Sequence, residues 1–362
     1  MMSAMTRRDF AAAIGGTWSA ALSLPSVLSW GAPNASSNGS VLDAAESASG
    51  LCVVRQTAQA FGAEGSLLIL HPEEKIARRA AKAAVAELEK VEEFLSLYRP
   101  ESEICRLNQA GVLARPHPYL VNALRKSLEM SAKSAGAFDV TVQPLWELYE
   151  ATKKSGRIPT SAELESARGK VDWRQIEVTA DEIRLKRRGM KVTLNAMAQG
   201  FAADRVLSAL RAHGISQALV NTGEIGAMGR RADGKPWTIG IQHPRRKDAF
   251  VALANLENCC MATSGDYASA FDDDYLRHHI FDPATGQSPR ELSSVTITAP
   301  SGTDADALST TVFVLGAENG LRLLAEFPKA EAFLVRKDGG IIKTRGFPEV
   351  QPEASDAGDI RC

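Results

Sequence analysis

Apolar side chains recur with a helical period in several long stretches of the chain. The longest stretch follows Pro72, where an apolar residue returns every three or four positions from Ile76 to Leu95. This spacing places the apolar residues on one face of a single long helix. The same criterion predicts a second helix that stops before Gly136, a third over 198–213, and two more over 304–315 and 319–327. Thr160 and Glu163 form a capping box, which predicts the start of a short helix.

Short apolar runs bounded by turn residues predict the strands. They lie at 218–221, 237–242, 250–256 and 294–299, and 332–335 is expected to pair with 341–343 across Gly339 and Gly340. Alternation on both sides of Arg188 and Gly189 predicts a hairpin that joins 183–185 to 192–194. Helices and strands come in unequal blocks and not as a regular βαβ series. The pattern therefore predicts an α+β fold of mixed helices and mainly antiparallel sheets.

The two ends of the chain lack the pattern of a packed fold. Arg7 and Arg8 precede a weakly apolar run that Pro25 interrupts, which is typical of a bacterial twin-arginine signal peptide. A permanent membrane anchor is the alternative, but the small and hydroxylated residues in this run weaken it. We expect a signal peptide over 1–35, a flexible leader over 36–52, one folded domain over 53–347 and a disordered tail over 348–362. The mature protein is then periplasmic, and its only membrane contact is the transient one through the signal.

Composition and charge exclude several classes of function. The chain has 42 Lys and Arg residues against 43 Asp and Glu, a net charge of -1, so it offers no basic field for nucleic acid. Its 44% hydrophobic and 23% charged residues are those of an ordinary globular protein. None of the five cysteines forms a CxxC pair, which argues against zinc and thioredoxin chemistry.

Asp306 and Thr310 are the first candidates for chemistry. They lie four residues apart at the start of a predicted helix, which places a carboxylate and a hydroxyl on one helical face. Both are hard oxygen donors of the kind that Mg²⁺ on a substrate pyrophosphate would take, and the first turn of a helix favours anionic oxygens nearby. The alternative is that the acidic residues here only offset the helix dipole.

Three other segments carry weaker signals. Residues 262–267 follow a β-like run, and their small side chains permit close backbone approach to a ligand, although a plain turn would look similar. His278 and His279 precede an Asp-Pro-x-x-Gly turn. Adjacent side chains on a strand point to opposite faces, so we expect one functional ring and one exposed ring in preference to a metal site made by the pair. Residues 136–139 by themselves predict only a capping turn.

Six ordered blocks of the sequence together resemble the ApbE-like family, the FAD:protein FMN transferases. The resemblance extends from about Phe61 to about Phe347. Its Ala-Gln-Gly and Gly-Glu motifs are similar to those of accessory proteins of nitrous-oxide reductase maturation. The blocks that carry it are 95–108, 136–145, 194–204, 262–267, 279–286 and 305–310.

The resemblance implies an ApbE-like fold and an Mg²⁺-dependent enzyme. Such an enzyme takes FAD and attaches FMN, through a phosphoester, to a Thr or Ser of a periplasmic or membrane electron-transfer protein, and releases AMP. The partner implied is an FMN-accepting electron-transfer protein, such as a membrane-bound maturation or electron-donor protein of nitrous-oxide reductase. Catalysis is assigned to His279 and Asp306. The flavin-nucleotide contacts implied are Tyr98, Ala137, Phe138, Asp139, Gln199 and His279, and the metal ligands implied are Asp306, Thr310 and the backbone carbonyl of Ala196.

The sequence also departs from the family pattern. Gln199 stands where many relatives have Lys, so a cation that would pair with phosphate is missing, although an amide still donates a hydrogen bond. Thr193, Ser309 and the segment 221–224 differ as well. Two alternatives therefore stay open. One is an FAD-binding or FAD-hydrolysing relative without transferase activity, and the other is a non-catalytic assembly factor for a periplasmic metalloenzyme. The combination of Asp306, Thr310 and His279 favours an enzyme.

Overall fold

The computed structural model describes residues 5–6, 42–46 and 50–350 of the chain. Nearly all of the predicted twin-arginine signal and residues 351–362 of the predicted tail lie outside the described residues. Met5–Thr6 form β1, which pairs with β11 (Ala249–Leu256). Among the helices of the described part, none is both long enough and apolar enough to span a membrane.

The centre of the molecule is a nine-stranded sheet in which every neighbouring pair is antiparallel. Its order is β15-β14-β13-β12-β9-β8-β4-β3-β2. This arrangement confirms the α+β prediction and the pairing of 332–335 with 341–343. The strands are β2 (Leu42–Glu46), β3 (Cys52–Ala60), β4 (Ala63–His71), β8 (Gln217–Asn221), β9 (Ile225–Met228), β12 (Cys260–Gly265), β13 (Leu292–Ala299), β14 (Glu331–Arg336) and β15 (Ile341–Lys343).

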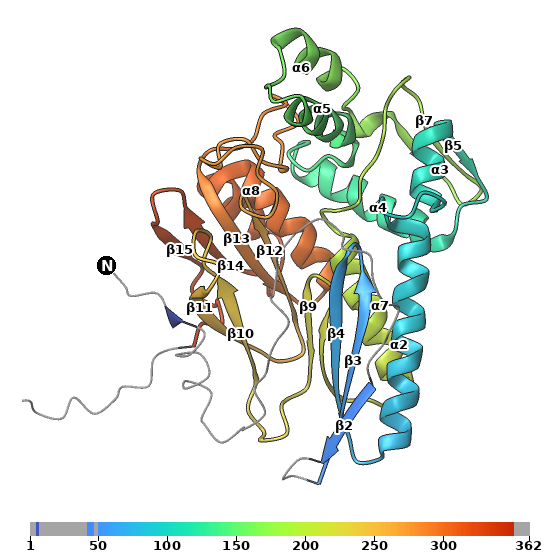
Figure 1. The fold of residues 1–362 in the computed structure, drawn as a ribbon, viewed down its shortest axis with the longest axis vertical. Helices are drawn as coiled ribbons and strands as arrows, with labels where there is room; N and C mark the ends of the chain where they lie inside the picture. The colour runs from blue at the N-terminus through green and yellow to red at the C-terminus, as the bar shows by residue number, and fades with distance from the viewer. Residues whose placement is uncertain (1–4, 7–41, 47–49, 351–362) are drawn as a thin grey trace, which may run out of the picture.

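Three long helices cover one face of this sheet (Figure 1). They are α2 (Glu74–Leu95), α7 (Ala198–Ala212) and α8 (Gly302–Leu324). The predicted apolar stripe of α2 is buried, and it packs on β3, β4 and α7. The backbone of α8 leaves the helical region at Gly316, with φ 76° and ψ 176°, which agrees with the two separate helical segments predicted there.

The other face of the sheet is covered by β11 and by β10 (Trp237–Gln242). Trp237, Leu256 and Phe333 form part of the core between these layers. Both strands match their predicted positions closely. The sheet is therefore buried on both sides, and the helical side holds the larger apolar cluster.

Smaller elements gather beyond one end of the sheet (Figure 1). Helix α6 begins at the predicted capping box, and both of its reciprocal hydrogen bonds are present. Helices α3 and α5 are absent from the sequence predictions. The elements here are α3 (Glu103–Ala110), β5 (Val112–Ala114), α4 (Pro118–Lys133), η1 (Val140–Val142), α5 (Gln143–Lys154), α6 (Ser161–Arg168), η2 (Trp173–Gln175), β6 (Ile176–Val178) and β7 (Glu182–Leu185).

The hairpin predicted around Arg188 and Gly189 is wrong. Strand β7 pairs with β5 and β6, and residues 192–194 are not a strand. The side chain of Asn108 binds both backbone groups of Val192, at 2.7 and 2.8 Å, and Thr193 N–H donates to the Val140 carbonyl at 2.8 Å. The apolar alternation arises because Val192 and Leu194 are buried. Hydrogen bonds to Asn108 and Val140, and not to a neighbouring strand, are made by the backbone groups of Val192 and Thr193.

The structure also changes the predicted limits of the folded part. Residues 42–46 of the expected flexible leader form strand β2 at the edge of the sheet. In the expected tail, the Pro348 carbonyl accepts a hydrogen bond from Asn255, and Val350 N–H donates to the Leu253 carbonyl. The ordered part of the chain therefore extends beyond 53–347 on both sides. The sequence pattern does not predict this, because these pairings are made by backbone groups and side-chain patterns do not reveal them.

Candidate functional site

Two glycines bring the N-terminal turns of α7 and α8 into backbone contact. A Cβ on Gly200 would lie 2.0 Å from the Gly302 carbonyl oxygen, and one on Gly302 would lie 2.5 Å from the Gly200 carbonyl oxygen. Only glycine fits at both positions. The close approach places the Asp306 carboxylate beside α7, where its Oδ2 accepts the Gly200 N–H at 3.0 Å.

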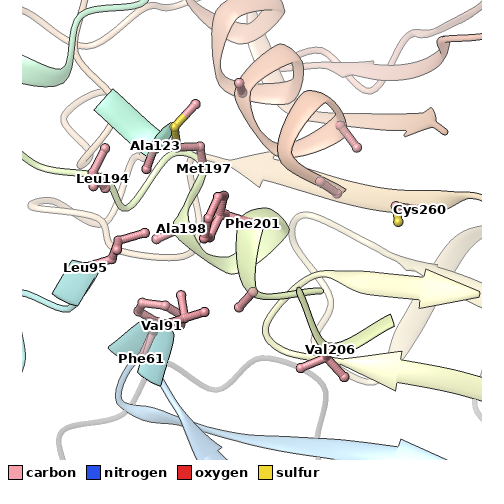
Figure 2. Close-up of a cluster of buried hydrophobic side chains, with 14 of the residues drawn as sticks. Phe61, Val91, Leu95, Ala123, Leu194, Met197, Ala198, Phe201, Val206 and Cys260 are labelled. Atoms are coloured by element: carbon pink, nitrogen blue, oxygen red, sulfur yellow. The ribbon is translucent and has the colours of Figure 1, made fainter. Parts of the chain in front are cut away.

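The Gly200 N–H belongs to the first turn of α7, where a backbone donor has no carbonyl partner within its own helix. Asp306 accepts this N–H, and Ala196, four residues earlier, precedes the helix. Met197, Ala198 and Phe201 hold this turn in place, because they lie in the apolar core against α2 (Figure 2). The backbone around Ala196 is therefore fixed by packing.

Thr310 lies one turn after Asp306 and is joined to the sheet. Its hydroxyl is 2.8 Å from Ser264 Oγ, which in turn is 2.7 Å from Ser309 Oγ. Ser264 belongs to β12, so residues 262–265 are a strand and not the turn that the sequence left open. A Cβ on Gly265 would lie 2.4 Å from the ring of Tyr267, so this glycine accommodates a side chain of its own chain and not a ligand.

Glu224, in the turn between β8 and β9, is a carboxylate whose role the sequence does not predict. Its Oε2 accepts the Thr263 N–H at 3.1 Å. Burial and the negative charge of Asp306 raise the pKa of Glu224 well above its ordinary range, and burial raises the pKa of Asp306 to about 7. Neither carboxylate has an ion-pair partner within 50–350. A divalent cation would offset the repulsion that these two groups experience.

The donors here suit a hard cation. In the described part of the chain no group of three or more His, Cys, Asp or Glu residues could hold a metal ion. A carbonyl oxygen, a hydroxyl and a carboxylate from Ala196, Thr310 and Asp306 are nevertheless the ligand types that Mg²⁺ accepts, with water and substrate phosphates completing its shell. The residues thus fit the metal that the sequence implies, and Glu224 is a second buried carboxyl group nearby.

Asp204 holds the start of α8 from the neighbouring helix α7. Its Oδ1 accepts the Gly302 N–H at 2.7 Å, and its Oδ2 accepts the Thr303 N–H at 2.9 Å and the Ser301 hydroxyl at 3.0 Å. A carboxylate at a helix N-terminus satisfies free N–H groups and favours the helix dipole. Sequence reasoning does not find this role, because the cap comes from a residue far from α8 along the chain.

Tyr98 and Gln199 line a small pocket beside the Ala196 turn, together with Phe61, Asn195 and Ala198. Tyr98 is 49% exposed, and its ring lies against Gly62, where a Cβ would be 3.6 Å from the ring. A Cβ on Gly223 would lie 2.1 Å from Gln199 Nε2, so the amide rests on the β8–β9 turn. Two predicted nucleotide contacts therefore adjoin the Asp306 cluster, which comprises Ala196, Glu224, Asp306 and Thr310.

In the segment 137–139, the side chains of Phe138 and Asp139 make contacts inside the folded protein. Phe138 is 2% exposed and belongs to the main core. Both oxygens of Asp139 accept internal hydrogen bonds: Oδ1 from the Thr141 N–H and hydroxyl, at 2.8 and 2.6 Å, and Oδ2 from the Trp173 N–H at 3.1 Å. Burial also raises the pKa of Asp139. A nucleotide at this segment would meet Ala137 and backbone groups before it meets these two side chains.

The two adjacent histidines have different surroundings. His278 is fully buried, so the prediction of one exposed ring is wrong, and burial lowers its pKa to about 3. His279 is more exposed to solvent than His278 but still partly buried. Burial lowers the pKa of His279 to about 4, so its ring is neutral at neutral pH. Its Nδ1 lies 3.3 Å from the Ser269 carbonyl oxygen. Within the described ranges no hydrogen bond or ion pair joins His279 or 137–139 to the Asp306 cluster.

Comparison with known families matches residues 61–334 to the ApbE family. The chain is 34% identical over 284 residues to a FAD:protein FMN transferase of Treponema pallidum (strain Nichols), covering 72% of this chain and 78% of the relative. It is 30% identical over 295 residues to a FAD:protein FMN transferase of Salmonella typhimurium, covering 75% and 82%.

Solved structures show the same fold. The flavinyl transferase ApbE of Pseudomonas stutzeri, in its apo form, superposes with a TM-score of 0.69 at 29% identity, covering 81% of this chain and 94% of the other. An ApbE protein of Thermotoga maritima superposes with a TM-score of 0.72 at 27% identity, covering 81% and 97%.

Proposed function

Because this chain belongs to the ApbE family and is an FAD:protein FMN transferase, we propose that it works with Mg²⁺ held at the crossing of α7 and α8. The observation that carries the proposal is the hydrogen bond from Gly200 to Asp306, which places a buried carboxylate against the first turn of α7, directly after Ala196 in the chain. Thr310 adds a hydroxyl one turn farther along α8. We propose that these three oxygens face one cation where α7 and α8 cross.

The residues have distinct roles in this proposal. Bound Mg²⁺ would neutralise charge on the FAD pyrophosphate, which is how phosphoryl transfer is mainly catalysed. Asp306, Thr310 and Ala196 would hold it, while Tyr98 and Gln199, which line the small adjoining pocket, would contact the nucleotide. The neutral His279 accepts the proton of the acceptor hydroxyl at Nε2, since Nδ1 faces a carbonyl and keeps its own proton.

The bonds change as follows. The acceptor hydroxyl oxygen forms a bond to the FMN phosphorus, and the bond from that phosphorus to the bridging oxygen breaks. AMP leaves with the bridging oxygen, and the hydroxyl proton passes to His279. The product is a phosphoester between FMN and a Thr or Ser of the acceptor. We infer that Arg7 and Arg8 direct this chain through the twin-arginine pathway to the periplasm, and that the acceptor is an exported electron-transfer protein.

Transfer is tested with the mature protein, FAD and a flavin-accepting domain that carries a Thr or Ser acceptor. With Mg²⁺ we expect one covalent FMN on the acceptor by intact mass and one equivalent of AMP, and with a chelator we expect neither. AMP release without FMN on the acceptor would support the FAD-hydrolysing alternative. Undiminished transfer in the chelator would contradict the metal site.

Replacement of Gln199 by Lys tests the nucleotide pocket. The amide neutralises no phosphate charge, so an ammonium group there should raise FAD affinity or lower the Mg²⁺ concentration that gives half-maximal activity. Because salt screens the added charge, we expect the shift to shrink as ionic strength rises. Titrations of FAD and Mg²⁺ at low and high salt measure both effects. Identical curves for the two proteins would mean that Gln199 does not face the phosphates.

A further inference from the structure

The orientation of His279 depends on one carbonyl group. The Ser269 carbonyl accepts the His279 backbone N–H at 3.0 Å and lies 3.3 Å from Nδ1 of the same residue. A carbonyl has no proton to donate, so Nδ1 must carry one, and the lone pair of the neutral ring is then on Nε2. Whatever holds the Ser269 carbonyl therefore decides which way the His279 ring turns and which nitrogen is free.

The Ser269 carbonyl belongs to a short antiparallel ladder outside the main sheet. Ala270 pairs with His278, and Phe271 N–H donates to the Arg277 carbonyl at 2.8 Å. The segment is therefore tied to the residues around His279 but has only a few backbone bonds of its own. A ladder of this length is not stable alone and needs packing from another element.

Helix α5 supplies that packing from one face. Leu145, Tyr149 and Lys153 are four residues apart, which aligns them along the helix. The Tyr149 ring contacts Phe271 and Phe281, with centroids 5.2 and 5.0 Å apart. Lys153 Nζ donates to the Ala270 carbonyl at 2.8 Å.

The same helix face also holds the chain that follows His279. Tyr149 Oη lies 3.5 Å from the Gly286 carbonyl oxygen. A Cβ on Gly286 would lie 3.2 Å from Leu145, so the turn after Phe281 fits closely against α5. Tyr149 thus contacts both segments that flank His279, one through Phe271 and the other through Phe281 and Gly286.

We propose that Tyr149, assisted by Lys153, is a positioning residue for His279 and that it acts through the Ser269 carbonyl. It touches neither nucleotide nor acceptor in this role. It holds the ladder so that the ring presents Nε2 to the acceptor hydroxyl, a role that rests on the function proposed above. Loss of the aromatic ring would let the ladder shift, and small displacements of a reacting group reduce the rate strongly.

The first test reads the His279 ring directly and needs no activity. Imidazole ¹⁵N shifts separate protonated from unprotonated nitrogens, and the chain has only six histidines to assign. At pH 7.5 we expect wild type and Tyr149→Phe to show His279 protonated at Nδ1 only. We expect Tyr149→Leu to show a mixture of both tautomers, and Lys153→Met a smaller change in the same direction. An unchanged His279 signal in folded Tyr149→Leu would overturn the proposal, whether or not the protein transfers FMN.

The second test is kinetic and uses a matched control. Tyr149→Leu is expected to lower kcat for FMN transfer roughly tenfold with little change in KM for FAD, while Tyr149→Phe keeps most of the rate. Phe347→Leu is the control, because Phe347 is a comparably buried ring, 8% exposed against 5%, in the core on the other face of the sheet. It should lose similar stability without the loss of kcat.

A double-mutant cycle distinguishes positioning from general damage. If Tyr149 acts only through His279, then Tyr149→Leu should change the residual rate of His279→Ala by less than about twofold. A further tenfold loss in that background, or an equal loss of kcat in Phe347→Leu, would mean that Tyr149 contributes only to folding. If wild type transfers no FMN, the proposed function fails and the ¹⁵N measurement still decides the orientation of the ring.

Discussion

Replacement of Asp306 by Ala or Asn is expected to reduce Mg²⁺-dependent AMP release by about 1,000-fold, because several kcal/mol of metal-dependent charge stabilisation is lost. Asp306 supplies the charged ligand at the crossing of α7 and α8, and its Oδ2 also accepts the Gly200 N–H. The Asn variant retains an oxygen for this N–H and removes only the charge. It is therefore the sharper test of the metal site, and AMP is measured by chromatography.

The unfolding temperature measured without metal shows whether the Asp306 variants remain folded. Burial raises the pKa of Asp306 to about 7, so an ionised carboxylate opposes folding at pH 8. In a chelator at pH 8, Asp306→Asn should then unfold at a temperature no lower than wild type does. Mg²⁺ together with FAD should stabilise wild type only. Full turnover by the Asn variant at ordinary Mg²⁺ concentrations would refute the ligand assignment.

Gly200→Ala is expected to cause the largest structural effect. Its Cβ would lie 2.0 Å from the Gly302 carbonyl oxygen and 2.7 Å from the Asp306 Cβ, far inside contact distance, and backbone atoms cannot rotate away. We expect a loss of about 3 kcal/mol in the free energy of unfolding, together with loss of FMN transfer, since α7 and α8 must separate. Urea unfolding and the transfer assay measure the two effects.

Gly169→Ala is the matched control for this substitution. Gly169 is the C-cap of α6 at negative φ, and a Cβ there would be no closer than 3.4 Å to any neighbouring atom. We expect it to leave both stability and activity within about 0.5 kcal/mol of wild type. If Gly200→Ala unfolded at the same urea concentration as wild type, the close crossing of the helices would not exist in solution.

The elements that follow from local pattern were predicted from the sequence with little error. The stripe of α2, the capping box of α6 and strand β10 depend on residues close together along the chain. The spacing of Asp306 and Thr310 on one helix is equally local. The blocks that resemble the ApbE family agree with the match over 61–334. These features need no knowledge of which distant segments meet.

The site itself was decided by contacts between distant segments. Gly200 meets Gly302, Asp204 caps a helix that begins nearly a hundred residues later, and Glu224 reaches Asp306 from another hairpin. The hairpin predicted at 192–194 was wrong for the same reason. Alternating burial there resembles that of a strand, but the Asn108 side chain makes the backbone hydrogen bonds of Val192. Side-chain periodicity reports which residues are buried and on which face. It does not report which distant backbone groups satisfy one another, and in this protein those pairings bring the carboxylates, the Ala196 carbonyl and the His279 loop to their places.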